Sequence, residues 1–208
     1  MQSEITFLSC LETRLNIPNY SKMPIPSFDY NHVLPPHLGN PINLTDLSPY
    51  HCSILEVCNH FGTSKERIEI LKGLVTFRQK MTENGVIYGF QWLDGSFLEN
   101  IEVSEKRPPN DIDVVTFFGG MTKVEQVNLA CKFPEFASAV LAKQNFKVDH
   151  YPFDYSYCPD ATVEMTRYWI QLFTHNRNSI WKGILRIPIN TLDDDQRALD
   201  YLNSLCKV

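Results

Sequence analysis

The sequence predicts one globular domain of the mixed α/β (α+β) class. A chain of 208 residues is long enough for one substantial core and short for two. Hydrophobic residues make up 43% and charged residues 21%, which is typical of a folded chain and excludes a disordered one. Four short segments rich in β-branched and aromatic residues alternate with segments of helical period, which indicates strands mixed with helices.

Residues 1–47 are interpreted as an N-terminal arm followed by a strap, and residues 48–208 as the domain. The first 23 residues carry a weak helical pattern, which favours an appended arm. Residues 24–41, "PIPSFDYNHVLPPHLGNP", contain five prolines that favour an extended, irregular path. The segment is nevertheless too apolar for a free linker, so we expect it to pack along the domain surface. Its apolar side chains are Phe28, Tyr30, Val33 and Leu34.

The domain is expected to begin with a helical part that ends near residue 84. Ser48 is followed by proline, a pair that predicts a helix start, and Gly62 predicts the end of that helix. Thr63 and Glu66 have the spacing of a capping box, so a second and longer helix is expected to begin there.

The remaining elements alternate between strand and helix. Strand segments are recognised by β-branched and aromatic residues, and helices by apolar residues three and four apart. We expect strands at residues 86–93, 111–118, 146–153 and 180–189, and helices at residues 123–145 with a break at Pro134, from a cap at Asp160, and from Thr191 or Asp193 to Leu205.

Charge and cysteine content restrict the partners and the compartment. The chain has 24 acidic and 19 basic side chains, a formal charge of −5, so its overall field repels nucleic acid and a polyanionic ligand needs a local cluster of cations. The six cysteines form no C-x-x-C pair, which favours reduced thiols in a cytoplasm. Neither a leader pattern nor a long apolar run is found, so we expect no membrane association.

Two aspartates on the second predicted strand are the first candidate site residues. Side chains alternate between the two faces of a strand, so Asp111 and Asp113 share one face. Like charges this close repel each other unless a cation lies between them. Magnesium prefers hard oxygen ligands, often one or two carboxylates completed by substrate phosphates. The pair therefore predicts a magnesium site.

The third predicted strand offers a further acid, Asp149. If this strand neighbours the second, Asp149 joins Asp111 and Asp113, and three acids can hold two metal ions roughly 4 Å apart. Asp154 competes for this role, but it lies at the opposite parity and beyond Pro152. We therefore prefer Asp149.

A Gly-Ser turn follows the first predicted strand. Gly95 lets the backbone approach phosphate oxygens closely, and Ser96 adds a hydroxyl donor. The turn is not a Walker loop, because no G-K-[ST] follows it. It predicts a phosphate-binding half of the same site.

Taken together in this order, these motifs resemble the DNA polymerase β-like nucleotidyltransferase superfamily. The matching positions are Gly95, Ser96, Asp111, Asp113 and Asp149. The resemblance implies a mixed sheet flanked by helices and catalysis with two Mg²⁺ ions, or Mn²⁺ in their place. It also implies a nucleoside triphosphate or deoxynucleoside triphosphate donor and a hydroxyl acceptor. The acceptor is left open between an RNA end, a protein and a growing oligonucleotide.

A closer resemblance covers nearly the whole chain. The segments "VLPPHLG", "SPYHCSILEVCNHFGTSKERIEILKGLVTFR", "WLDGSF", "RPPNDIDVVTFF", "YWIQLF" and "WKGIL" are similar to an uncharacterised bacterial family of nucleotidyltransferase-like proteins, named only as a domain of unknown function. Small bacterial nucleotidyltransferases often serve in phage defence or in toxin–antitoxin pairs. That context implies a partner protein encoded alongside.

The chain departs from compact toxin–antitoxin enzymes in its cations. Those enzymes carry arginines shortly after the Gly-Ser turn, whereas here the first basic residues are Lys106 and Arg107. On the fourth predicted strand Lys182 and Arg186 share a face, so they are candidates for binding the triphosphate. The alternative is that both are solvated residues of an edge strand.

Three other functions stay open at this stage. A nucleotidyltransferase fold without catalysis could bind nucleotide or a partner protein. Hydrolysis of nucleic acid at the same metal ions would need no triphosphate. The neighbouring Asp149 and His150 fit part of a hydrolase triad, but no nucleophile elbow accompanies them.

Overall fold

The computed structural model describes residues 25–206, and the structural statements below concern that range. The predicted arm in the first 23 residues lies outside it. No helix in the described range is long and apolar enough to cross a membrane.

A five-stranded mixed sheet in the order β1-β5-β2-β3-β4 forms the centre of the protein. β2 is antiparallel to both of its neighbours, whereas β3 and β4 are parallel, as are β1 and β5. Together with seven α-helices in residues 25–206, this sheet confirms the predicted mixed α/β class. The strands are β1 (Tyr50–His51), β2 (Gly89–Asp94), β3 (Ile112–Phe118), β4 (Val148–Asp154) and β5 (Leu185–Pro188).

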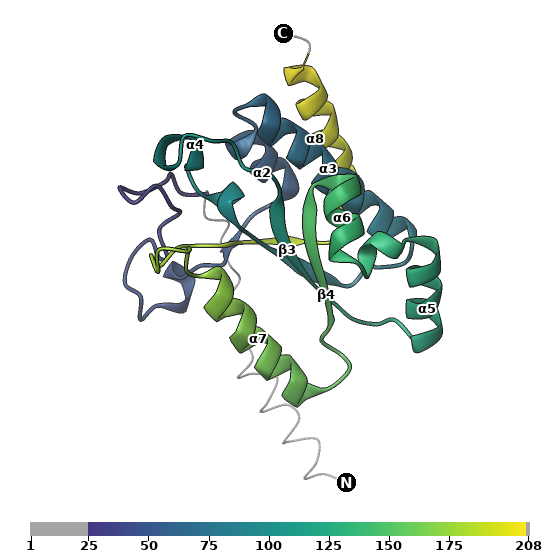
Figure 1. The fold of residues 1–208 in the computed structure, drawn as a ribbon. Coiled ribbons are helices and arrows are strands. Elements are labelled where there is room, and N and C mark those ends of the chain that lie inside the picture. The colour runs from purple at the N-terminus through teal and green to yellow at the C-terminus, as the bar shows by residue number, and fades with distance from the viewer. Residues whose placement is uncertain (1–24, 207–208) are drawn as a thin grey trace.

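Helices cover both faces of the sheet, and they do so unequally (Figure 1). α2, α3, α6 and α8 lie on one side of β3 and β4, and α7 lies on the other. The short α4 and α5 lie at the periphery. Their bounds are α2 (Ile54–Phe61), α3 (Lys65–Glu83), α4 (Ile101–Ser104), α5 (Lys123–Lys132), α6 (Ala139–Phe146), α7 (Pro159–Phe173) and α8 (Leu192–Leu205).

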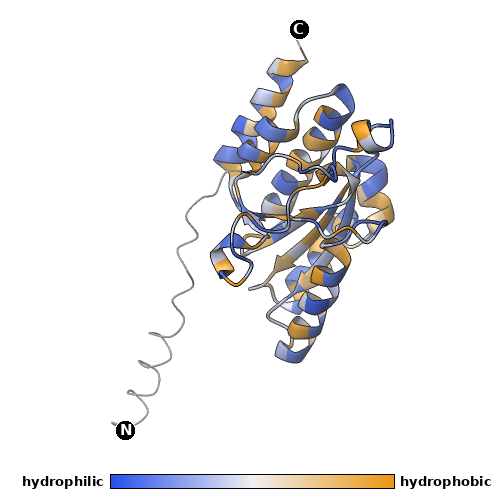
Figure 2. Ribbon diagram, turned by 90° about the vertical axis from the view of Figure 1, so that its left-hand side faces the viewer, coloured by the Kyte–Doolittle hydropathy of each residue, from blue (hydrophilic) through white to orange (hydrophobic). Residues whose placement is uncertain are grey.

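The unequal cover produces two separate apolar cores. Leu93, Val114 and Val148 point from the strands into the larger core beneath α2, α3 and α8. The opposite face supplies a small aromatic core under α7, built on Trp92 and Phe117. Figure 2 shows the strands in largely hydrophobic colours at the centre, with helices of mixed character around them.

The first helix begins later than the sequence predicted. Ser53, not Ser48, caps α2, and its side chain and that of Glu56 form a capping box. The prediction at Ser48 was wrong because the residues that follow it form β1, which pairs with the first residues of β5. Ser64 caps α3, one residue beyond the predicted Thr63.

Later elements mostly follow the prediction. The helix predicted at residues 123–145 is broken as expected, because Pro134 begins a 3₁₀ turn between α5 and α6. Two strands are shorter than predicted, with β2 beginning at Gly89 and β5 spanning four residues. The N-cap of α7 is Cys158 without a side-chain cap bond, so the cap predicted at Asp160 was wrong.

The described part of the strap packs against the domain as expected. Val33 forms an isolated bridge with Glu99, and Leu34 is fully buried. The Tyr50 hydroxyl donates a 2.6 Å hydrogen bond to the Pro35 carbonyl. Tyr30 is the exception, because 89% of it is exposed. The strap therefore lies over the segment that follows β2.

A line of hydrogen bonds crosses the larger core from α8 to β4. Each link joins a buried donor to a buried acceptor, which is the condition for keeping polar groups in an apolar interior. We call it the core network, and its links are Asp195–Arg78 at 2.8 Å, Arg78–Gln91 at 2.6 Å, Gln91–Thr116 at 3.0 Å and Thr116–His150 at 2.7 Å.

Candidate functional site

Three aspartates from adjacent strands line up at one end of the sheet. Asp94 at the end of β2 is paired in register with Asp113 near the start of β3, and Asp113 with Asp149 near the start of β4. Partners in register project from the same face, here the face of the small aromatic core. We call these three residues the acidic row. The structure brings the predicted Asp113 and Asp149 together and adds Asp94, which was not among the predicted site residues.

Asp111 joins the site from just outside the strand. It immediately precedes β3, and its side chain is 16% exposed. Its charge and that of Asp149 both act on Asp113. The predicted D-x-D pair is thus present as two neighbouring carboxylates, one in the acidic row and one beside it.

The Gly95 turn lies directly against the acidic row. Gly95 has a φ of 86°, which favours glycine, and a Cβ added there would lie 2.6 Å from Oδ2 of Asp113. Ser96 follows as the first residue of a short 3₁₀ turn. A residue with a side chain would collide with Asp113 here, so glycine is required. The turn and the Asp113 carboxylate therefore form one continuous surface.

The acidic row is electrostatically strained. Burial, followed in size by the charges of Asp111 and Asp149, raises the pKa of Asp113 to about 6. Burial also raises the pKa of Asp94 to about 7, despite its ion pair with Lys182. Raised pKa values of this kind cluster at functional sites, because a structural strand has no need to hold several acids together.

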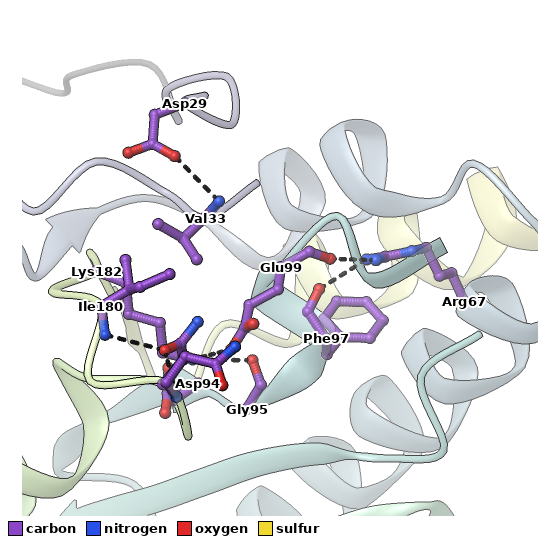
Figure 3. A network of polar contacts seen from close by, with 11 residues as sticks. Asp29, Val33, Arg67, Asp94, Gly95, Phe97, Glu99, Ile180 and Lys182 are labelled. Carbon is purple, nitrogen blue, oxygen red and sulfur yellow. Dashed lines mark hydrogen bonds and ion pairs between the residues drawn. The ribbon is translucent and has the colours of Figure 1, made fainter. Parts of the chain in front are cut away.

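Lys182 is the buried cation of the site (Figure 3). Its side chain is 2% exposed, and Nζ lies 2.9 Å from Asp94 Oδ1 and 2.8 Å from Glu99 Oε1. It also donates a 3.2 Å hydrogen bond to the carbonyl of Gly95. The contact with Asp94 is an ion pair and not a hydrogen bond. Oδ1 of Asp94 is buried and accepts no hydrogen bond. Lys182 therefore fastens the turn from beneath.

A second buried cation, Arg67, holds the segment after the turn. Its guanidinium donates 2.7 Å hydrogen bonds to the carbonyls of Phe97 and Glu99 (Figure 3). It also pairs with Glu102 at 2.6 Å. Arg67 is on α3, 30 residues before Phe97 in the chain. Sequence reasoning missed it because an arginine within an amphipathic helix normally faces solvent.

Arg186 lies one side-chain position away from the acidic row, and its role as a triphosphate-binding cation stays a prediction. It pairs in register with Trp92, one side-chain position along the face from Asp94 and so roughly 7 Å away. Its guanidinium carbon lies 3.7 Å from the ring centroid of Phe90, a residue still farther from the row. Arg186 thus stacks on an aromatic ring.

Lys143 is the exposed cation of the site, and the sequence analysis did not identify it. It lies on α6, and Nζ is 2.5 Å from Asp111 Oδ2 and 3.5 Å from Asp149 Oδ2. Those two carboxylates raise the pKa of the Lys143 ammonium. Five carboxylates, with Glu99 included, therefore share two ammonium groups, so the site keeps an excess of negative charge.

Two alternatives weighed on the third strand are resolved by position. Asp154 is at the other end of β4 from Asp149, where it binds Gln126 and Ser156. His150 points to the opposite face, where it is buried with Nδ1 2.9 Å from the Phe136 carbonyl. Asp149 and His150 therefore cannot act as a pair in a hydrolase triad.

The donor set suits a hard divalent cation, but it is not a complete protein cage. Aspartate oxygens are the ligands that Mg²⁺ and Mn²⁺ prefer, and Gly95 leaves open the space beside Asp113 that a side chain would fill. Within residues 25–206 no three acidic, imidazole or thiol side chains converge as a ready-made metal site. The residues fit a metal held by one or two carboxylates, with its remaining ligands supplied from outside the chain.

Comparison with known proteins places most of the chain within one family. Residues 26–188 match the model of a family described as "Family of unknown function (DUF6932)". No curated protein and no solved structure matches the chain.

Proposed function

The chain belongs to DUF6932, a family of unknown function, and we propose that it is a metal-dependent nucleotidyltransferase of the DNA polymerase β-like superfamily. One observation carries the proposal. Asp113 and Asp149 stand in register on adjacent parallel strands, and the Gly95 turn packs against the Asp113 carboxylate. These contacts support the proposal, in which a metal-binding pair, a further acid and a phosphate-binding turn would share one surface.

The aspartates divide the work between metal and acceptor. Asp111 and Asp113 would hold the metal through their carboxylate oxygens, with Asp149 beside them. Two magnesium ions, or manganese ions, would neutralise the triphosphate and lower the pKa of the acceptor hydroxyl when bound. Asp113 has a pKa of about 6, so it is ionised and able to act as a ligand at neutral and higher pH.

The turn and its buried cation serve the triphosphate. Gly95 and Ser96 would contact the phosphates through backbone amides and the serine hydroxyl. Lys182 would keep the turn in place and reduce the negative charge behind it, because its Nζ is bound to Asp94, Glu99 and Gly95. Arg186 would contribute its charge from a distance.

In the proposed reaction the acceptor oxygen attacks the α-phosphorus of the triphosphate. The bond from acceptor oxygen to phosphorus forms, the bond from the α-phosphorus to the bridging oxygen breaks, and pyrophosphate leaves with that electron pair. The acceptor proton passes to a carboxylate oxygen of Asp149. The overall charge of −5 favours a small or protein acceptor over a long nucleic acid.

One observation favours a second candidate function, which is nucleotide or partner binding without catalysis. Lys143 already pairs with both Asp111 and Asp149, as a cation would in a protein that needs no metal. In that case the protein would bind a triphosphate and release no pyrophosphate.

A labelling experiment tests the proposal. The protein is incubated with each α-labelled ribo- and deoxynucleoside triphosphate, with Mg²⁺ or Mn²⁺, alone and with short RNA or protein acceptors. Release of pyrophosphate with a labelled product, lost in Asp111→Ala and Asp113→Ala, is the expected result. Cleavage of RNA without any triphosphate would instead indicate hydrolysis.

Asp154→Ala is the matched control for these variants. It removes a carboxylate from the same sheet at the opposite end of β4, away from the acidic row. Its activity should equal that of the wild type. Tight binding of a triphosphate with no turnover for any nucleotide and acceptor would refute the nucleotidyltransferase and favour the binding module.

A further inference from the structure

Lys143 occupies the place between two of the proposed ligand carboxylates. Its ammonium lies 2.5 Å from Asp111 and 3.5 Å from Asp149, and it reaches them from α6 rather than from the sheet. A divalent cation bound by the same oxygens would need this space. Lys143 and a bound metal ion would therefore compete for the carboxylate oxygens of Asp111 and Asp149.

Lys143 is held much more loosely than the other ammonium of the site. Its side chain is 52% exposed, whereas that of Lys182 is 2% exposed and lies among three partners. A half-exposed lysine on a four-carbon stem can swing into solvent at little cost, because exposed ion pairs contribute little net stability. Lys182 cannot leave without exposing buried carboxylates.

We propose that Lys143 is an exchangeable counter-ion, displaced from Asp111 and Asp149 by a divalent cation and then bound to the polyphosphate of the incoming nucleotide. The inference rests on the proposed function, since it assigns a nucleotide to this site. A doubly charged ion neutralises the acids better than one ammonium does, and the two cations repel each other at such short range.

Once displaced, the Lys143 ammonium would bind the polyphosphate at the Gly95 turn. No basic residue occurs between Ser96 and Lys106, so the turn itself supplies no side-chain cation. Lys182 is committed to Asp94 and Glu99, and Arg186 stacks on Phe90. Lys143 thus provides the mobile positive charge that a triphosphate at the Gly95 turn would meet.

Manganese binding without nucleotide tests the first half of the inference. Lys143→Met keeps the length of the side chain and removes its charge, and free Mn²⁺ is counted by electron paramagnetic resonance. We expect Lys143→Met to bind Mn²⁺ about five-fold more tightly than the wild type, because the competing ion pair is gone. Equal or weaker binding, or no binding by either protein, would overturn the inference.

Lys147→Met is the matched control. Lys147 lies four residues away, is similarly exposed, and pairs with Glu69 at 2.9 Å outside the site. It carries the same change in net charge, so it separates local competition from the general field of the protein. Its affinity for Mn²⁺ should stay at the wild-type value. A gain equal to that of Lys143→Met would refute local competition.

Nucleotide binding tests the second half. With saturating Mn²⁺ and a non-hydrolysable triphosphate, Lys143→Met should bind the nucleotide about five-fold more weakly than the wild type, the opposite sign to the metal result. Unchanged or tighter nucleotide binding would refute the polyphosphate contact. Neither measurement requires turnover, so a protein that shows both effects but releases no pyrophosphate would refute the nucleotidyltransferase and retain the exchange. Thermal unfolding of each variant confirms that it is folded.

Discussion

The two faces of the sheet both hold buried polar side chains, and they differ in how the charges are balanced. In the core network one guanidinium, Arg78, meets one carboxylate, Asp195, and neutral groups complete the line. On the other face the acidic row and its neighbours outnumber their two lysines. Balanced charge with nearly every donor and acceptor paired is what stability requires, whereas an unpaired excess of one sign indicates a ligand.

The largest effect should come from Asp113→Asn, with opposite signs for activity and stability. If Asp113 is a metal ligand, as proposed, its loss should reduce the proposed nucleotide transfer by at least roughly a thousandfold. The pKa of Asp113 is raised from 3.8 to about 6, so the folded protein binds this proton more tightly than the unfolded chain does. Stability therefore falls as the pH rises from about 3.8 to about 6, and the loss is complete above pH 6. Neutral asparagine should therefore raise the free energy of unfolding at pH 8 by up to about 3 kcal/mol.

Chemical denaturation at pH 8, beside the transfer assay, checks both signs. Asp154→Asn, at the far end of β4, serves as the control, and it should leave activity at the wild-type value. A less stable Asp113→Asn protein would show that the acidic row is structural.

A substitution in the core network should lower stability and leave activity unchanged, the reverse of Asp113→Asn. Arg78→Met leaves Asp195 as an uncompensated buried charge, and breaking a buried pair in this manner costs about 3–5 kcal/mol. Urea denaturation should register the loss, while activity per folded molecule stays at the wild-type value.

Arg197→Met provides the contrast to Arg78→Met. Arg197 pairs with Asp194 at 3.1 Å on the same helix as Asp195, but it is two-thirds exposed. We expect a loss of less than about 0.5 kcal/mol, because exposed pairs contribute little. Similar losses for both variants would contradict the distinction drawn between balanced burial and surface pairing.

The general architecture could be predicted from the sequence because it depends on local signals. Alternation and helical period identified four strands and most helices, and parity correctly placed Asp113 and Asp149 on a common face. β1 was missed, because two residues carry no period and form a strand only by pairing with β5. Lengths were overestimated for β2 and β5, where the apolar run continues beyond the paired residues.

The cations of the site were not predictable, because their positions depend on packing. Lys143 reaches the acids only because α6 ends in a left-handed residue, Lys147, that turns the chain directly into β4. Arg67 is buried only because the segment after Gly95 covers it. The sequence predicted Lys182 as a cation that binds the triphosphate. It carries no signal that Asp94 and Glu99 would enclose the Lys182 ammonium.

The stability of the core network should depend on pH through His150, in contrast to the acidic row, and this effect should be of intermediate size. Arg78 only donates, so Gln91 presents its oxygen to Arg78 and its NH₂ to Thr116, and Thr116 then donates its hydroxyl proton to Nε2 of His150. His150 is thereby neutral with its proton on Nδ1, and burial lowers its pKa to about 3. The unfolded chain binds this proton near pH 6.5, so stability contributed by His150 is present above pH 6.5 and is lost as the pH falls toward 3.

Between pH 7 and pH 5 the wild type should lose about 2 kcal/mol through His150. His150→Asn should abolish this part of the loss, although it lowers stability at both pH values by removing packing against Phe77 and Phe136. Chemical denaturation gives the free energy of unfolding of both proteins at pH 7 and pH 5. The carboxylates titrate alike in both proteins, so their contribution cancels when the two pH-dependent changes are subtracted. An unchanged pH slope in the variant would show that His150 is not the group responsible.

A smaller effect than that of His150 is expected at the contact between Gly95 and Asp113, the two halves of the proposed site. Gly95→Ala places a Cβ 2.6 Å from Asp113 Oδ2 at a φ of 86°, so it should cost about 1–2 kcal/mol of stability through strain and the displaced carboxylate. In an Asp113→Ala background only the backbone strain remains, and the cost should fall by about 0.5–1 kcal/mol. This coupling, measured by a double-mutant cycle in urea, reports the contact itself. Additive costs would mean that turn and carboxylate do not touch, and the proposed common surface for phosphate and metal would lose its basis.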